Sequence, residues 1–149
     1  MGRTPMVKLI VAAVFLALLP VPQYGAEPTS LASIKRIAIG SMGQNDEAER
    51  FRLLLDAELG KAGFATTNDE KAADAVLTGA LSVRVYPDGA VARVTVVLKT
   101  PEGSQVWSQD FQPRFKIGGT SDSVKLRAQD VAKALKKEAE KAASKAAKH

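Results

Sequence analysis

The sequence predicts an α/β (α+β) two-layer sandwich, in which an antiparallel meander and two amphipathic helices enclose one core. Two turn-forming segments, PDGA and PEGS, begin fourteen residues apart, at positions 87 and 101, within valine-rich alternation. Helical periodicity precedes the first turn and follows the second. The 149 residues, 46% of them hydrophobic, suffice for a single core. The predicted order is β-α-β-β-β-β-α, with the meander over 75–115 and helices over 46–62 and 121–140 on one face.

The amino-terminal segment, residues 1–26, is predicted to be an export signal. Arg3 and Lys8 precede LIVAAVFLALL, an apolar run of eleven residues that ends at Pro20. A membrane span needs about 20 apolar residues, so an uncleaved anchor is the weaker alternative. Cleavage after Ala26 would leave a short lead segment, residues 27–33, and a periplasmic or secreted protein.

A strand and a helix are expected to open the folded domain, which we place at residues 34–137. SIKRIAIG is rich in β-branched residues and ends at Gly40. The following segment repeats apolar residues every three or four positions, which is typical of one helical face. Asn45 or Asp46 is expected to cap this helix, and Gly63 suits the left-handed residue that ends it. A short strand, FATT, is expected next.

The two turns predict a specific strand register. If PDGA and PEGS are both four-residue loops, the apolar positions of three strands fall on one face. The expected pairs are Tyr86 with Val91, Val83 with Val94, Leu81 with Val96, Thr100 with Gln105, Leu98 with Trp107 and Val94 with Phe111. The helices are expected to cover this face, and Pro113 indicates that the last strand lies at an edge.

The last segment predicts a second amphipathic helix that begins near GGTSDS. Val124, Ala128, Val131 and Leu135 recur at helical spacing. Residues 138–149 differ, because their apolar positions are only alanine, which buries little area. We expect an Ala/Lys-rich helical tail that runs into solvent and frays.

The charge distribution argues against a nucleic-acid-binding face. The chain has 21 basic and 16 acidic residues, yet residues 27–130 carry 13 basic and 14 acidic side chains. The excess therefore belongs to the leader and the tail, where residues 131–149 contain six lysines. The tail has no large apolar residue after Leu135, so we expect no stable membrane anchor once the signal is cleaved. The absence of cysteine excludes disulfides and lipid-modified cysteine.

Few residues have the pattern that catalysis or cofactor binding requires. The single histidine is His149, the final residue, and GSMG at 40–43 lacks the ending of a phosphate-binding loop. Carboxylates at 46, 47 and 49 suit a helix amino terminus without a metal ion. We therefore expect no cofactor, no metal and no catalysis. Two alternatives stay open: a hydrolase with an unrecognised carboxylate pair, for which Asp88 or Asp110 is the first candidate, and a carrier of a small ligand between helix and sheet.

The outward face of the predicted sheet contains a candidate partner-binding strip. In the expected register Arg84 lies opposite Arg93, and like charges in that position are unfavourable. Asp110, diagonal to Arg93 on the next strand, offers a purely structural compensation. The alternative is a mixed basic and apolar surface that binds a partner. That candidate site comprises Arg84, Tyr86, Arg93, Thr95, Val97 and Lys99.

At IKRIAIG, AADAVLTG and GSQVW the chain resembles bacterial envelope accessory proteins that share a small α/β domain. These are the domain of the curli-secretion lipoprotein, the penicillin-binding-protein activator lipoprotein and the amino-terminal domain of the Tol translocation protein. The resemblance covers about residues 34–137 and implies an exported, non-catalytic domain that binds an envelope protein. This chain has no acylatable cysteine, no membrane hairpins and no propeller repeats, so pore formation and propeller functions are not implied.

Overall fold

The computed structural model describes residues 30–117 and 119–148. The predicted signal, residues 1–26, lies outside these residues, as do residues 27–29 of the lead segment. The elements follow the predicted order, with two short 3-10 helices added. They are η1 (Leu31–Ser33), β1 (Arg36–Ile39), α2 (Asp46–Lys61), β2 (Ala65–Thr67), η2 (Glu70–Ala72), β3 (Ala75–Tyr86), β4 (Gly89–Lys99), β5 (Gln105–Lys116) and α3 (Thr120–Ala147).

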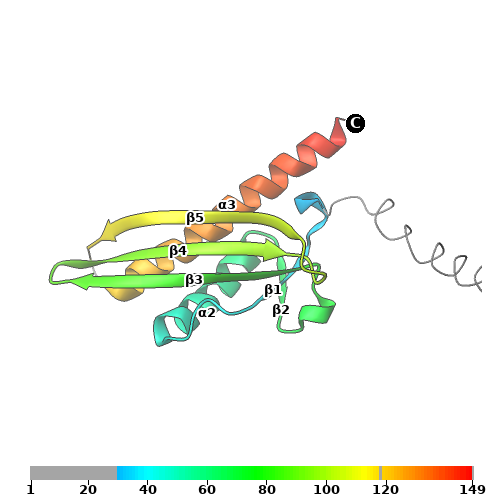
Figure 1. Cartoon of the computed structure of the whole chain (residues 1–149). Helices are drawn as coiled ribbons and strands as arrows, with labels where there is room; N and C mark the ends of the chain where they lie inside the picture. The colour runs from blue at the N-terminus through cyan, green and yellow to red at the C-terminus, as the bar shows by residue number, and fades with distance from the viewer. Residues whose placement is uncertain (1–29, 118, 149) are drawn as a thin grey trace, which may run out of the picture.

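The five strands form one mixed sheet in the order β2-β1-β3-β4-β5. β1 runs parallel to both of its neighbours, whereas β3, β4 and β5 form the predicted antiparallel meander. β5 lies at the edge of the sheet, as Pro113 indicates. The long meander strands and the short β1 and β2 are visible in Figure 1.

Both helices cover the same face of the sheet, which confirms the two-layer α+β architecture (Figure 1). Buried side chains from helices and strands interlock between the layers and form one core cluster. Phe111 is buried and Trp107 is partly buried against this cluster, as the meander predicts. Fully buried members include Phe51, Leu55, Leu59, Leu77, Val94, Val96, Leu98, Val124 and Leu135.

The register of the first hairpin differs from the prediction. Tyr86 pairs with Gly89, so the loop contains only Pro87 and Asp88 and not four residues. As a result Leu81 lies opposite Val94, and every β3–β4 pair is displaced by two positions. Side chains alternate with a period of two along a strand, so this displacement leaves every residue on its predicted face.

The second hairpin confirms the predicted central pairs and corrects one end. Leu98 lies opposite Trp107, and Val94 lies opposite Phe111. The predicted pair of Thr100 with Gln105 is wrong, because a register shift places Gln105 opposite Lys99. The shift accommodates a turn in which the Thr100 amide donates to the Ser104 carbonyl at 2.8 Å and the Ser104 amide donates to Thr100 Oγ1 at 3.1 Å.

The helix ends follow local capping rules. Asn45 Oδ1 accepts a hydrogen bond from the Ala48 amide at 2.8 Å, which confirms Asn45 as the cap of α2. Gly63, with φ of 99°, follows the end of that helix. α3 is 28 residues long and continues through the predicted tail to Ala147. No helix in the described part of the chain combines the length and hydrophobicity that a membrane span requires.

Candidate partner-binding surface

The six predicted site residues share the sheet face opposite α2 and α3, which no helix among the described residues covers. Their positions alternate with buried positions along β3 and β4, so they project away from α2 and α3. Five are exposed and Val97 is half-buried. The residues on β3 are Arg84 and Tyr86, and those on β4 are Arg93, Thr95, Val97 and Lys99.

The centre of this face is a polar cluster around Asp110. Arg93 donates to this carboxylate through Nη2 at 2.8 Å and Nε at 3.3 Å, and Thr95 Oγ1 donates at 2.9 Å. Gln112 Nε2 adds a contact of 3.2 Å. The Arg93 guanidinium and then the Thr95 hydroxyl lower the pKa of Asp110 below its ordinary value. Asp110 is therefore the acidic neighbour of Arg93 that the sequence indicated.

The predicted clash of two arginines does not occur. Because the first hairpin is displaced by two residues, Arg84 lies opposite Val91 and Arg93 lies opposite Ser82. The like-charge pair was a consequence of the wrong loop length. Arg84 is exposed on the same face, so the structure leaves it in the candidate surface without the repulsion that first drew attention to it.

The strip extends along the whole length of the sheet and does not form one compact patch. Tyr86 lies at the β3–β4 turn, whereas Lys99 lies opposite Val76 at the other end of β3. At the rise of an extended strand, the distance between these ends is on the order of 30 Å. The structure therefore brings Arg93 and Thr95 together at the centre and leaves Lys99 in a separate region.

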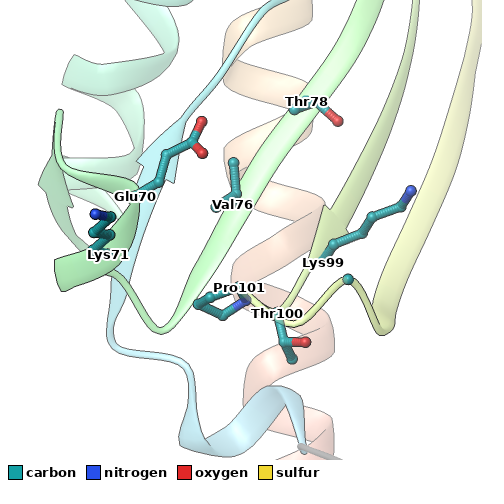
Figure 2. Close-up of a pocket in the computed structure, with 8 residues that line it drawn as sticks. Glu70, Lys71, Val76, Thr78, Lys99, Thr100 and Pro101 are labelled. Atoms are coloured by element: carbon teal, nitrogen blue, oxygen red, sulfur yellow. The ribbon is translucent and has the colours of Figure 1, made fainter.

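Lys99 contributes to a shallow hollow of about 400 Å³ on the uncovered face. In Figure 2 Glu70 reaches from η2 toward the sheet on one side of the hollow, and Lys99 extends on the other. Val76 and Thr78 of β3 lie between them. The remaining lining residues are Lys71, Thr100, Pro101 and Gly103. The hollow is lined by both acidic and basic side chains, so a bound polar molecule could contact either charge. It lies outside the helix–sheet core.

Glu70 was not among the predicted site residues, because in sequence it is one charge among several in the segment NDEK. Its position depends on η2, a single 3-10 turn that Asp69 caps by accepting from the Lys71 amide at 3.0 Å. An Asp followed by a short polar segment gives the only local signal for this turn. The pairing of β1 with β3 then brings η2 beside the sheet, and that pairing is not evident from local sequence.

Asp88 and Asp110, the two carboxylates considered for hydrolysis, do not form a pair with each other. Asp88 lies in the β3–β4 turn, and Asp110 lies opposite Thr95 in the middle of β5. Along β4 this separation is roughly 20 Å, whereas paired catalytic carboxylates lie about 5–10 Å apart. Among residues 30–117 and 119–148, no group of three or more His, Asp or Glu side chains is arranged to hold a metal ion.

The GSMG segment at 40–43 continues from β1 alongside β3. The Gly40 amide donates to the Leu77 carbonyl at 2.8 Å, and the Ser41 and Met42 carbonyls accept from Gly79 and Leu81, both at 3.0 Å. The Gly40 amide is therefore bonded within the fold, and Met42 is buried in the core.

Comparison with known proteins identifies the fold. No family model matches the chain, and no curated protein matches it. A solved dodecamer of PelC from Paraburkholderia phytofirmans, crystallised in space group P6, is similar with a TM-score of 0.56 and 20% identity over 71% of this chain and 92% of that chain. A dodecamer of a PelC variant from the same organism gives a TM-score of 0.57 and 19% identity over 74% of this chain and 94% of that chain. The chain thus shares the fold of the PelC subunit over nearly that subunit's full length.

Proposed function

We propose that this protein is an exported, non-catalytic subunit that associates with further copies of itself and assists the assembly or transport functions of the cell envelope. The observation that carries the proposal is the fold similarity over 94% of a PelC chain that forms a dodecamer. The resemblance of three sequence segments to envelope accessory domains supports the same cellular role.

An exposed apolar end of the sheet supports the association with other copies. Val85 is 69% exposed and Ile117 is 77% exposed. Ala90 pairs with Lys116, so the end of β5 lies beside the β3–β4 turn that also carries Tyr86. Val85 and Tyr86 are consecutive and project from opposite faces of β3, so the exposed apolar side chains surround this end of the sheet, where a contact with another copy would cover them. We name Val85, Tyr86 and Ile117 the apolar tip.

The direct test is the mass of the exported protein in solution, measured by light scattering during gel filtration and by native mass spectrometry. We expect an oligomer whose mass is a multiple of the chain mass. A Val85→Ser, Ile117→Ser variant should associate more weakly, so its oligomer should dissociate at a higher protein concentration than the wild-type oligomer does. The matched control is Leu53→Ser, which changes another exposed large apolar residue, 59% exposed, on α2. A wild-type protein that stays monomeric at every concentration would refute self-association.

The uncovered sheet face is the proposed surface for an envelope protein. On this face Arg84 lies two residues before Tyr86, a member of the apolar tip. Arginine and tyrosine side chains are enriched where proteins meet. Crosslinking in the periplasm should identify this partner. An Arg84→Ala, Arg93→Ala variant should recover less of it than wild type, whereas Lys61→Ala on α2 should not differ. Equal recovery by the double variant would remove this face from the proposal.

A further inference from the structure

The net positive charge of the described chain is concentrated in the distal part of α3. Residues 30–132 carry 13 basic and 13 acidic side chains and are balanced. Residues 133–148 carry six lysines against Glu138 and Glu140. Each of these lysines is exposed, and together they make up what we name the lysine face: Lys133, Lys136, Lys137, Lys141, Lys145 and Lys148.

The lysines form a continuous ridge along the helix. Lys133, Lys137, Lys141 and Lys145 recur every four residues, and each step advances only about 40° around the helix axis. Like charges at this spacing repel one another, so the ridge is unfavourable within the helix itself. The helix dipole favours cations only within the last turn. It therefore accounts for Lys145 but not for the earlier members of the ridge.

The amino-terminal end of the described chain lies beside the same part of α3. Ala32 and Ile34 border a groove whose other wall includes Lys136 and Ala139. Figure 1 shows the last turns of α3 extending past the end of the sheet, on the side where η1 lies. The described chain begins at residue 30, shortly after the predicted cleavage site at Ala26. The groove therefore places Lys136 of the lysine face beside the amino-terminal end of the described chain.

We propose that the lysine face adsorbs the protein onto an anionic phospholipid surface through charge attraction, without insertion into the lipid. Lysines near an anionic bilayer each contribute about a fivefold gain in affinity, and clusters of four to eight act together. The helix has only alanines as apolar residues after Leu135, so it lacks the large side chains that insertion requires. The lysine face also lacks aromatic side chains on which nucleic-acid bases would stack. Adsorption is consequently reversible by salt.

The test is flotation of the exported protein with phosphatidylcholine vesicles that contain or lack phosphatidylglycerol. We expect binding only to the anionic vesicles at about 0.05 M salt and release at about 0.5 M salt. A Lys137→Gln, Lys141→Gln variant should bind roughly 25-fold more weakly. The matched control is Arg50→Gln, Lys125→Gln, which removes the same charge from two exposed residues outside the lysine face.

Several outcomes would overturn this inference. One is equal affinity of the protein for neutral and anionic vesicles, and another is no affinity for anionic vesicles. A third is a loss of affinity in the control variant as large as that in the Lys137→Gln, Lys141→Gln variant. Binding to soluble polyglutamate or RNA without binding to anionic vesicles would point to a different partner. Circular dichroism checks that the variant retains its helix, and light scattering of the same samples reports association separately. A monomer that adsorbs through these lysines would refute self-association but leave this inference intact.

Discussion

Arg93 and Asp110 join β4 to β5 on the uncovered face of the sheet, with 2.8 Å between Nη2 and Oδ2. Thr95, which lies directly opposite Asp110, donates to the same carboxylate. One acidic residue therefore satisfies an arginine and a threonine of the neighbouring strand. This arrangement ties the outer strand of the meander to its central strand by side chains as well as by the backbone ladder.

Asp110→Asn should weaken this tie. The variant keeps one acceptor oxygen but loses the charge that strengthens the Arg93 contact. Because the pair is exposed to solvent, we expect a small fall in the midpoint of thermal unfolding at low salt that disappears at high salt. A double-mutant cycle with Arg93→Ala measures the coupling. Identical unfolding of wild type and variant at both salt concentrations would contradict the expected role.

The hydrogen bonds of Asp74 should make the free energy of unfolding depend on pH in the acid range. Its Oδ2 accepts from the Arg36 and Lys35 amides at 2.9 Å and 2.8 Å, and these bonds lower the pKa of Asp74. Because the folded-state pKa is depressed, the stabilisation is complete above the unfolded-state pKa and is lost as pH falls through the folded value. Urea unfolding of wild type and Asp74→Asn over this acid range measures the effect. The difference between them should shrink with falling pH, and a constant difference would exclude Asp74 as its source.

Gly79→Ala should be strongly destabilising. An added Cβ would lie 2.3 Å from the Thr95 carbonyl oxygen, and neither backbone can move away within the paired strands. We expect a loss of at least about 2 kcal/mol in the free energy of unfolding. The control is Gly60→Ala on α2, where nothing lies within 4 Å of the added atom. That change should stabilise the helix by about 0.5–1 kcal/mol. Equal unfolding free energies for the two variants would contradict this prediction.

Arg127 should be required for the attachment of β5 to α3. It is 2% exposed, and its Nη1 donates to the Gln112 carbonyl at 3.0 Å while Nη2 contacts Asp130 at 2.6 Å. Arg127→Ala removes both contacts and leaves a cavity, at an expected cost of about 2–4 kcal/mol. Hydrogen exchange should accelerate first around Gln112. Exchange that accelerates equally in β1 would instead indicate a global effect.

The sequence predicted the order of elements, because capping residues, turn residues and apolar periodicity are local signals. Asn45 as a helix cap and Pro113 on an edge strand are examples that the structure confirms. These signals did not determine the length of the β3–β4 loop, which has two residues and not the predicted four. A displacement of two residues preserves every face, so the alternation that predicts Val94 as a core residue cannot distinguish the two registers.

The sequence predicted which face of the sheet carries the candidate surface, but not how far apart its residues lie. Alternation alone places Arg84, Arg93 and Lys99 on one side of the sheet. Whether they are close depends on the register and on the length of the strands. The hollow beside Glu70 depends further on the parallel pairing of β1 with β3, residues 37–39 with 75–77, which joins segments far apart in the chain.

The packing of η1 against α3 has a consequence for the course of folding. The meander joins strands that are neighbours in sequence, so its hairpins close short loops, whereas η1 and α3 enclose nearly the whole described chain between them. Closing so long a loop adds entropy cost and slows formation. The meander should therefore form early and the junction of the two chain ends late, so partial unfolding in mild denaturant should begin where Leu31 meets the last helix.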